Sequence, residues 1–209
     1  MIQEHKVLFV DWNRTLSNSL FWGHLQVNKP EDFAKIERWL FKKNPQIINL
    51  WMRGEEDVKS ILSAMEQDTS LPENYLLNEL EKSCKSMEFI FHECLEIISL
   101  IRSKGIKVVL ATDNMDVFNQ YTVPALNLQN HFDDILSSFS LKCLKTDEDE
   151  KGNLKFFEVW LFENRIPIKN AALIDDSVKH KEFFEAKGLS FLPVNDDLSV
   201  LDHLKKYAY

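Results

Sequence analysis

The feature that most constrains the fold is a series of short strand-like runs that alternate with helical patterns after residue 105. Each run is too short for a helix, and the four are IKVVLA (106–111), DDILSS (133–138), AALID (171–175) and LSFLPV (189–194). Strands that alternate with helices in this way predict a parallel sheet with right-handed crossovers. The earlier run KVLFVD (6–11) is apolar from Val7 to Val10 and ends in an acid, as expected of a strand buried on both faces. We therefore predict an α/β fold with a doubly wound (Rossmann-like) parallel sheet.

A long segment of helical periodicity separates residues 6–11 from the other predicted strands. From Pro30, the segment PEDFAKIERWLFKK has acids in its first turn and apolar side chains at helical intervals, including Phe33 and Ile36. Similar periods continue to about residue 95, with breaks at Gly54 and Pro72. The pattern predicts an all-helical cap at 17–95, inserted into an α/β core formed by 1–16 and 96–209.

The charge and hydropathy of the chain exclude several classes of partner. The 209 residues include 25 Lys and Arg against 33 Asp and Glu, a net charge of −8, which disfavours binding to a nucleic-acid backbone. The apolar runs are far shorter than the ~20 residues that a membrane helix needs, and the start MIQEHK lacks the apolar core of a signal peptide. We expect a cytoplasmic protein that binds neither nucleic acid nor membrane, and the sequence leaves its oligomeric state open.

The residues that follow the predicted strands form a chemically coherent set. In doubly wound sheets the ligand lies beyond the carboxyl ends of the strands, so these residues are expected to meet at one edge. They include Asp11 and Asn13, then Thr112, Asp113 and Asn114, then Lys145 and Lys151, and finally Asp175 and Asp176. Phosphoryl transfer through a covalent aspartyl intermediate needs a carboxylate nucleophile, oxygen ligands for a hard cation, a lysine, and hydroxyl or N–H groups around the phosphate. The set supplies all of these.

Four segments in order resemble the motifs of the haloacid dehalogenase-like (HAD) superfamily with a type 1 helical cap: VLFVDWNRTL, VVLATDN, LKCLKTD and ALIDDS. The resemblance implies that Asp11 is the nucleophile of a Mg²⁺-dependent phosphatase. It assigns phosphate binding to Thr112, Asp113, Asn114 and a lysine, and Mg²⁺ ligation to Asp11, the Asn13 carbonyl and Asp175. Asp176 then acts as a partner of the lysine or of a metal-bound water. The implied substrate is a small phosphorylated metabolite.

The position of the site lysine stays open between two residues. Counting forward from Ser138 favours Lys145, whose KTD resembles the KPD of the family. Counting back from the helix that contains Phe156 favours Lys151. We prefer Lys145, which leaves Lys151 as a surface residue in an acidic loop.

Asn13 is the one departure from the motif that affects the chemistry. The family's phosphatases usually place Asp there as general acid and base, and an amide can do neither. The phosphatase is therefore expected to be slow or restricted to good leaving groups. Two alternatives remain: a metal-independent dehalogenase-type hydrolase, which needs no acid at this position, and a non-catalytic phosphate-binding pseudoenzyme.

Overall fold

The core of the molecule is a five-stranded parallel sheet. The computed structural model describes residues 5–209, so the first four residues of the predicted core segment 1–16 and of the MIQEHK start lie outside the described part. The strand order is β3-β2-β1-β4-β5, and all neighbouring strands are parallel. The strands are β1 (Val7–Val10), β2 (Lys107–Thr112), β3 (Asp134–Ser137), β4 (Ala171–Asp175) and β5 (Ser190–Pro193). The predicted doubly wound α/β sheet is confirmed.

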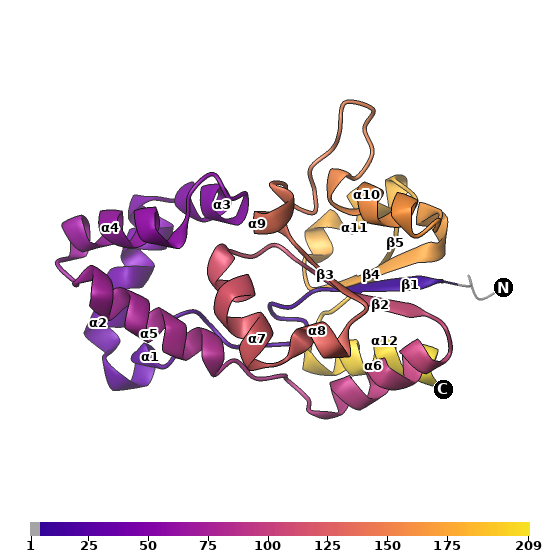
Figure 1. Ribbon diagram of the computed structural model, residues 1–209, viewed down its shortest axis with the longest axis horizontal. Coiled ribbons are helices and arrows are strands. Elements are labelled where there is room, and N and C mark those ends of the chain that lie inside the picture. The colour runs from indigo at the N-terminus through magenta and orange to yellow at the C-terminus, as the bar shows by residue number, and fades with distance from the viewer. Residues whose placement is uncertain (1–4) are drawn as a thin grey trace.

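Helices cover both faces of this sheet (Figure 1). Leu8 and Val10 face a core formed with α6 (Glu93–Ser103) and α12 (Asp197–Ala208). Val7 and Phe9 point to the opposite face, where α10 (Lys155–Glu163) and α11 (Lys181–Ala186) contribute to a second core. Because successive side chains of a strand alternate between faces, a strand covered on both sides must be apolar throughout. This explains the unbroken apolar run of β1.

Short helical turns complete the connections around the sheet. They are η2 (Phe118–Thr122), α7 (Val123–Ala125), α8 (Leu128–His131), α9 (Ser138–Leu141), η3 (Ile168–Asn170) and η4 (Val178–His180). The C-terminal helix α12 is an element that the sequence patterns above do not predict. It begins at a capping Asp196, whose side chain accepts a hydrogen bond from the Ser199 N–H. Within residues 5–209, no helix combines the length and the apolar character needed to cross a membrane.

Most of the chain between β1 and α6 forms a helical insertion, which we define as α1 to α5. Its elements are α1 (Leu25–Asn28), α2 (Pro30–Glu37), the π-helical turn η1 (Arg38–Lys43), α3 (Ile47–Met52), α4 (Val58–Thr69) and α5 (Glu73–Lys85). Figure 1 shows these indigo and purple helices gathered at the left, away from the sheet. Their buried side chains, among them Trp51 and Met65, form an apolar cluster that also includes Met115 and Val117 from the segment after β2.

Local sequence signals position the helices of the insertion. Pro30 occupies the first turn of α2, where its missing N–H costs no hydrogen bond. The side chain of Asp57 accepts a hydrogen bond from the Ser60 N–H, and the Ser60 hydroxyl is bonded in return to the Asp57 N–H, which together form a capping box at the start of α4. Gly54 has a φ of 64°, and a Cβ there would collide with the Lys142 side chain. A glycine is thus required where the insertion approaches the core.

Candidate active site

Two carboxylates leave the sheet side by side. Val10 of β1 pairs with Ile174 of β4, and the Asp11 N–H donates to the Ile174 carbonyl at 2.9 Å. The residues that follow this pair, Asp11 and Asp175, therefore emerge together at the carboxyl edge. This edge lies where the strand order reverses, since β2 and β3 lie on one side of β1 and β4 and β5 on the other. Doubly wound folds bind their ligands at such a point.

Lys145 bridges the two carboxylates. Its Nζ lies 2.9 Å from Oδ1 of Asp11 and 2.5 Å from Oδ2 of Asp175, and all three side chains are buried. Of the two lysines considered from the sequence, the structure thus brings Lys145 to the carboxylates. Lys151 is exposed on the turn before α10, where its backbone N–H donates to Asp149. The intervening turn carries Lys151 to the surface, so the structure does not bring this second predicted lysine to the carboxylates.

The three charges shift one another's protonation. Burial raises the pKa of the Asp11 carboxyl to about 7; the attraction of Lys145 opposes the rise and the negative charge of Asp175 adds to it. Burial alone would lower the pKa of the Lys145 ammonium, but the carboxylates of Asp11 and Asp175 outweigh it and raise that pKa above its ordinary value. Lys145 is therefore held as a cation, and it favours the ionised form of Asp11.

A third carboxylate, that of Asp176, completes a cluster suited to a hard cation. Asp11, Asp175 and Asp176 each offer an oxygen, and these oxygens lie within 4.8 Å of one another. Burial raises the pKa of the Asp176 carboxyl, and the charge of Asp175 adds to this rise. Three carboxylates face one ammonium, so the cluster has an excess of negative charge that a divalent cation would neutralise. Because Mg²⁺ takes oxygen ligands, this donor set fits it.

Asn13, the remaining predicted ligand, is partly exposed and lies two residues after Asp11. Asn13 pairs with Ser17 in a single β-bridge, where the chain turns away from β1. Within that turn Arg14 is exposed and has a φ of 56°. The side chain at position 13 is an amide, so the cluster contains no acid at the place where the sequence motif usually has one.

The predicted phosphate-binding residues at the end of β2 are placed differently from one another. Thr112 is fully buried, and its Oγ1 accepts a weak hydrogen bond from the Asn114 amide at 3.4 Å. The Asn114 N–H donates to the Ser138 hydroxyl, and its Oδ1 accepts from the Met115 N–H. Asn114 is thus buried and internally bonded, so the structure does not present its side chain to a ligand. This local network accounts for its departure from the predicted role.

Asp113 lies nearer to the site than its neighbours. Its Oδ1 accepts a hydrogen bond from the Lys145 N–H at 3.0 Å, which helps to fix the lysine. Burial raises the pKa of the Asp113 carboxyl, while Lys145 opposes that rise. A carboxylate repels phosphate, so a phosphate contact at this position would have to come from the backbone rather than the side chain.

A cavity of about 210 Å³ opens beside the carboxylates. On the core side it is lined by Asp113, Lys145 and Asp175, and on the insertion side by Asn49 and Met52 of α3. Sequence reasoning did not single out Asn49 or Met52, because nothing in a helical pattern identifies which face meets a second domain. It also gave no role to Thr15, whose buried Oγ1 has no hydrogen-bond partner among the described residues.

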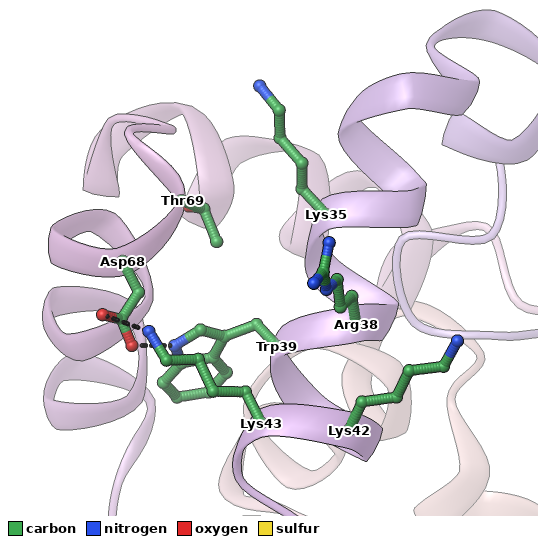
Figure 2. A pocket seen from close by; sticks show the side chains of 7 residues that line it. All are labelled: Lys35, Arg38, Trp39, Lys42, Lys43, Asp68 and Thr69. Atoms are coloured by element: carbon green, nitrogen blue, oxygen red, sulfur yellow. Dashed lines mark hydrogen bonds and ion pairs between the residues drawn. The ribbon is translucent and has the colours of Figure 1, made fainter.

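A larger hollow, of about 610 Å³, is lined only by residues of the insertion, at positions 35–69, and by none of these carboxylates. Figure 2 shows Lys35, Arg38 and Lys42 around it, with Asp68 bonded to Lys43 and to the indole of Trp39. Its one carboxylate, that of Asp68, is engaged by Lys43 and Trp39, and its lining holds no group of acidic side chains that could bind a cation. The chemistry therefore points to the smaller cavity.

Solved structures share the fold of this chain. A predicted HAD-like family hydrolase from Porphyromonas gingivalis matches with a TM-score of 0.72 and 15% identity, over 97% of this chain and 98% of that one. A HAD family enzyme from Bacteroides thetaiotaomicron matches with a TM-score of 0.67 and 16% identity, over 95% and 98%. That enzyme has also been solved in complex with magnesium and inorganic phosphate.

A third similar structure is the L-2-haloacid dehalogenase from Xanthobacter autotrophicus with chloropropionic acid covalently bound, at a TM-score of 0.63 and 11% identity, over 91% of this chain and 77% of that one. No protein-family model matches the sequence, and no curated protein matches it. At these identities the likeness shows the fold. The chain has the HAD-like fold, as the sequence motifs predict.

Proposed function

We propose that the chain is a HAD-like hydrolase, specifically a Mg²⁺-dependent phosphohydrolase that acts on a small phosphorylated metabolite through an aspartyl-phosphate at Asp11. The observation that carries this proposal is the placement of Asp11, Asp175 and Asp176 in one oxygen cluster, with Lys145 bonded to the first two. The structural likeness to an enzyme solved with magnesium and inorganic phosphate supports it.

The reaction would proceed in two displacements at phosphorus. In the first, a carboxylate oxygen of Asp11 forms a bond to phosphorus as the bond from phosphorus to the leaving oxygen breaks. In the second, water attacks the phosphorus of the aspartyl-phosphate, loses its proton to solvent and releases inorganic phosphate with Asp11 restored. Lys145 stays protonated throughout, because the neighbouring carboxylates hold its pKa high, and its charge orients Asp11 and offsets that of the phosphate.

Asp11, Asp175 and Asp176 are the residues that would hold the cation, with the Asn13 carbonyl as a further ligand. When bound, Mg²⁺ supplies positive charge that neutralises phosphate oxygens and lets an anionic substrate approach the carboxylates. The chain's own contribution is to fix these groups. The Ser177 N–H donates to Oδ1 of Asp175 at 2.7 Å, while Lys145 holds Oδ2, so the orientation of this carboxylate is determined on both sides.

Asn13 restricts the substrates that such a site turns over well. The leaving oxygen must take its proton from solvent, because the amide has none to give at neutral pH. General acid catalysis is worth about 10²- to 10⁴-fold, so alkyl and sugar phosphates lose most of this factor. Acyl phosphates and phosphoanhydrides leave as weakly basic anions and lose little. The proposed substrate is therefore a small molecule with a good leaving group.

The helical insertion is proposed to act as the cap, with the core at 1–16 and 96–209. Asn49 and Met52 of α3 line the cavity opposite Lys145, so the insertion limits the size of what can bind. We place the protein in the cytoplasm, with a small phosphorylated molecule as its partner.

A metal-independent dehalogenase is the second candidate, and one observation favours it: Asn13 stands where phosphatases have an acid, and halide displacement needs none. The likeness to a haloacid dehalogenase is consistent with this. The acidic cluster favours the phosphatase, because additional carboxylates repel a haloacid and gain nothing from a halide leaving group. The third alternative, a phosphate-binding pseudoenzyme, keeps the cluster without turnover.

A phosphate-release assay separates these functions. The protein is incubated with Mg²⁺ and acetyl phosphate, p-nitrophenyl phosphate or a sugar phosphate, beside its Asp11→Asn variant and a parallel chloride-release assay with 2-chloropropionate. We expect phosphate release that is fastest with acetyl phosphate and is lost in the variant, whose fold is retained because the change is isosteric. Chloride release without phosphate release would replace the proposal with the dehalogenase. Release of neither would favour the pseudoenzyme.

A further inference from the structure

An arginine of the insertion is bonded to the loop that carries Lys145. The guanidinium of Arg53, at the end of α3, forms a bidentate pair with Asp147: Nη1 contacts Oδ2, and Nη2 donates to Oδ1 at 2.8 Å. The two residues are 94 positions apart in the sequence and both are partly buried. Two parallel charge-assisted bonds fix the relative orientation of the partners as well as their distance.

Asp147 also organises the turn around Lys145 from within. Its Oδ2 accepts the Leu144 N–H at 2.9 Å, its N–H donates to the Leu144 carbonyl at 3.0 Å, and its own carbonyl accepts the Lys155 N–H at 2.9 Å. One residue thus closes the turn at 144–147 and joins it to the start of α10. Lys145 lies inside that turn, with its N–H bonded to Asp113.

On the other side of the pair, Arg53 ends the helix that forms a wall of the cavity. Asn49 and Met52 of α3 line the cavity, and Arg53 follows Met52 directly. Two further contacts hold the same stretch to the core: the Trp51 indole donates to Asp116 at 2.8 Å, and the Lys142 ammonium donates to the Gly54 carbonyl at 3.1 Å. Of these three contacts, only the one from Arg53 reaches the turn that contains Lys145.

We infer that Asp147 is a positioning residue for Lys145 and that Arg53 couples it to α3, so that closure of the cavity wall and presentation of the lysine occur together. The inference rests on the proposed function, because it concerns the same site, yet the coupling itself is a property of the folded chain. Asp11 is 4% exposed in this conformation, and a movement of the cavity wall beside Lys145 would change that exposure. Because Arg53 joins this wall to the turn at 144–147, such a movement would also shift Lys145 relative to Asp11.

Hydrogen exchange tests the coupling without any substrate. In Arg53→Gln, the amides of Leu144 and of residues 50–53 should exchange faster by on the order of tenfold, the size expected for neighbouring groups that share a contact. Amides of α12 should not change. The matched control is Arg38→Gln, which removes an exposed arginine of the same insertion and should leave all these amides unchanged. Arg53→Lys keeps the charge but loses the bidentate geometry, and it should fall between wild type and Arg53→Gln.

Two results of this experiment would overturn the inference. Unchanged exchange at Leu144 in Arg53→Gln would show that the lysine turn does not depend on the arginine. Faster exchange at residues 50–53 alone would show that Arg53 merely holds its own helix. Both results can be read even if the wild-type protein releases no phosphate, so failure here and failure of the proposed function are distinguishable.

Steady-state kinetics test the positioning role. Arg53→Gln and Asp147→Asn should each lower kcat for acetyl phosphate by on the order of tenfold. The double variant should be no slower than the slower single variant, because both substitutions break the same Arg53–Asp147 contact. Arg53→Lys should recover part of the loss. A residue with a merely structural role would lower the melting temperature and leave kcat of the folded enzyme unchanged. Full multiplication of the two single effects, or an unchanged kcat, would contradict the inference.

Discussion

The Nζ atom of Lys145 lies 2.9 Å from Oδ1 of Asp11, although 134 residues separate them in the sequence. The sheet brings Asp11 to its carboxyl edge, and the turn closed by Asp147 brings the lysine over it. A buried carboxylate without such a partner would be protonated at neutral pH and could not attack phosphorus. The contact therefore favours the ionised form of Asp11, which is the form that the proposed attack on phosphorus requires.

Replacement of Lys145 by Met should destabilise the fold and abolish activity. It leaves Asp11 and Asp175 buried without their shared cation, and the loss of one partner of a buried pair costs about 3 to 5 kcal/mol. Denaturant titration without Mg²⁺ measures this cost. Lys151→Met is the control, because that lysine is exposed, and its free energy of unfolding should change by less than about 0.5 kcal/mol. Equal effects of the two changes would contradict the assignment of Lys145.

Magnesium should stabilise the native protein through the acidic cluster. A ligand that binds only the folded state raises the melting temperature as its concentration rises above its dissociation constant. We expect this increase in wild type and its loss in Asp175→Asn, because the substitution removes a charged ligand from the cluster. Asp202→Asn, an exposed acid on α12, should respond to Mg²⁺ like wild type. A melting temperature that does not respond to Mg²⁺ in wild type would count against the metal site.

Asn13→Asp should restore proton transfer to the leaving group. Turnover of an alkyl or sugar phosphate should rise by a factor of about 10² to 10⁴, whereas acetyl phosphate should gain far less. The difference follows from basicity, since an alkoxide needs a proton as it departs and a carboxylate does not. Comparison of kcat for the two substrates checks this. Equal gains on both would mean that Asn13 acts through geometry or metal affinity.

The sheet and much of the site could be predicted from the sequence because they depend on local patterns. Apolar runs such as β1 are fixed by burial on both faces, and the residues after parallel strands must meet at one edge. The site lysine could not be chosen by counting, since the length of the turn before α10 decides whether Lys145 or Lys151 faces inward. The Arg53–Asp147 pair leaves no local signal, because it depends on how the insertion packs on the core.

Acidification should weaken the fold through His5, which joins the start of β1 to the end of the chain. Its ring nitrogens lie 2.7 Å from the Tyr207 hydroxyl and 2.9 Å from that of Ser190. Burial lowers the pKa of His5 below its ordinary value of 6.5, so the neutral ring is the form that the fold favours. The contribution of neutral His5 to the free energy of unfolding is fully present above pH 6.5. It is lost as the pH falls through the lowered pKa of His5.

Chemical unfolding at a series of pH values checks this contribution. The free energy of unfolding of wild type should fall more steeply between about pH 7 and pH 5 than that of His5→Gln, which cannot titrate there. His131→Gln serves as the comparison because it replaces a different histidine, on α8. Identical slopes for wild type and His5→Gln would show that His5 makes no such contribution.

The most direct test of the account is whether Asp11 becomes phosphorylated. Wild-type protein mixed with Mg²⁺ and acetyl phosphate, quenched in acid within the first turnover and digested, should yield a peptide containing Asp11 that is heavier by one phosphoryl group. The modification should disappear under alkaline hydroxylamine, which cleaves acyl phosphates, and should be absent from Asp11→Asn. Phosphate release with the phosphoryl group on another residue, or with equal modification of Asp11→Asn, would contradict the account.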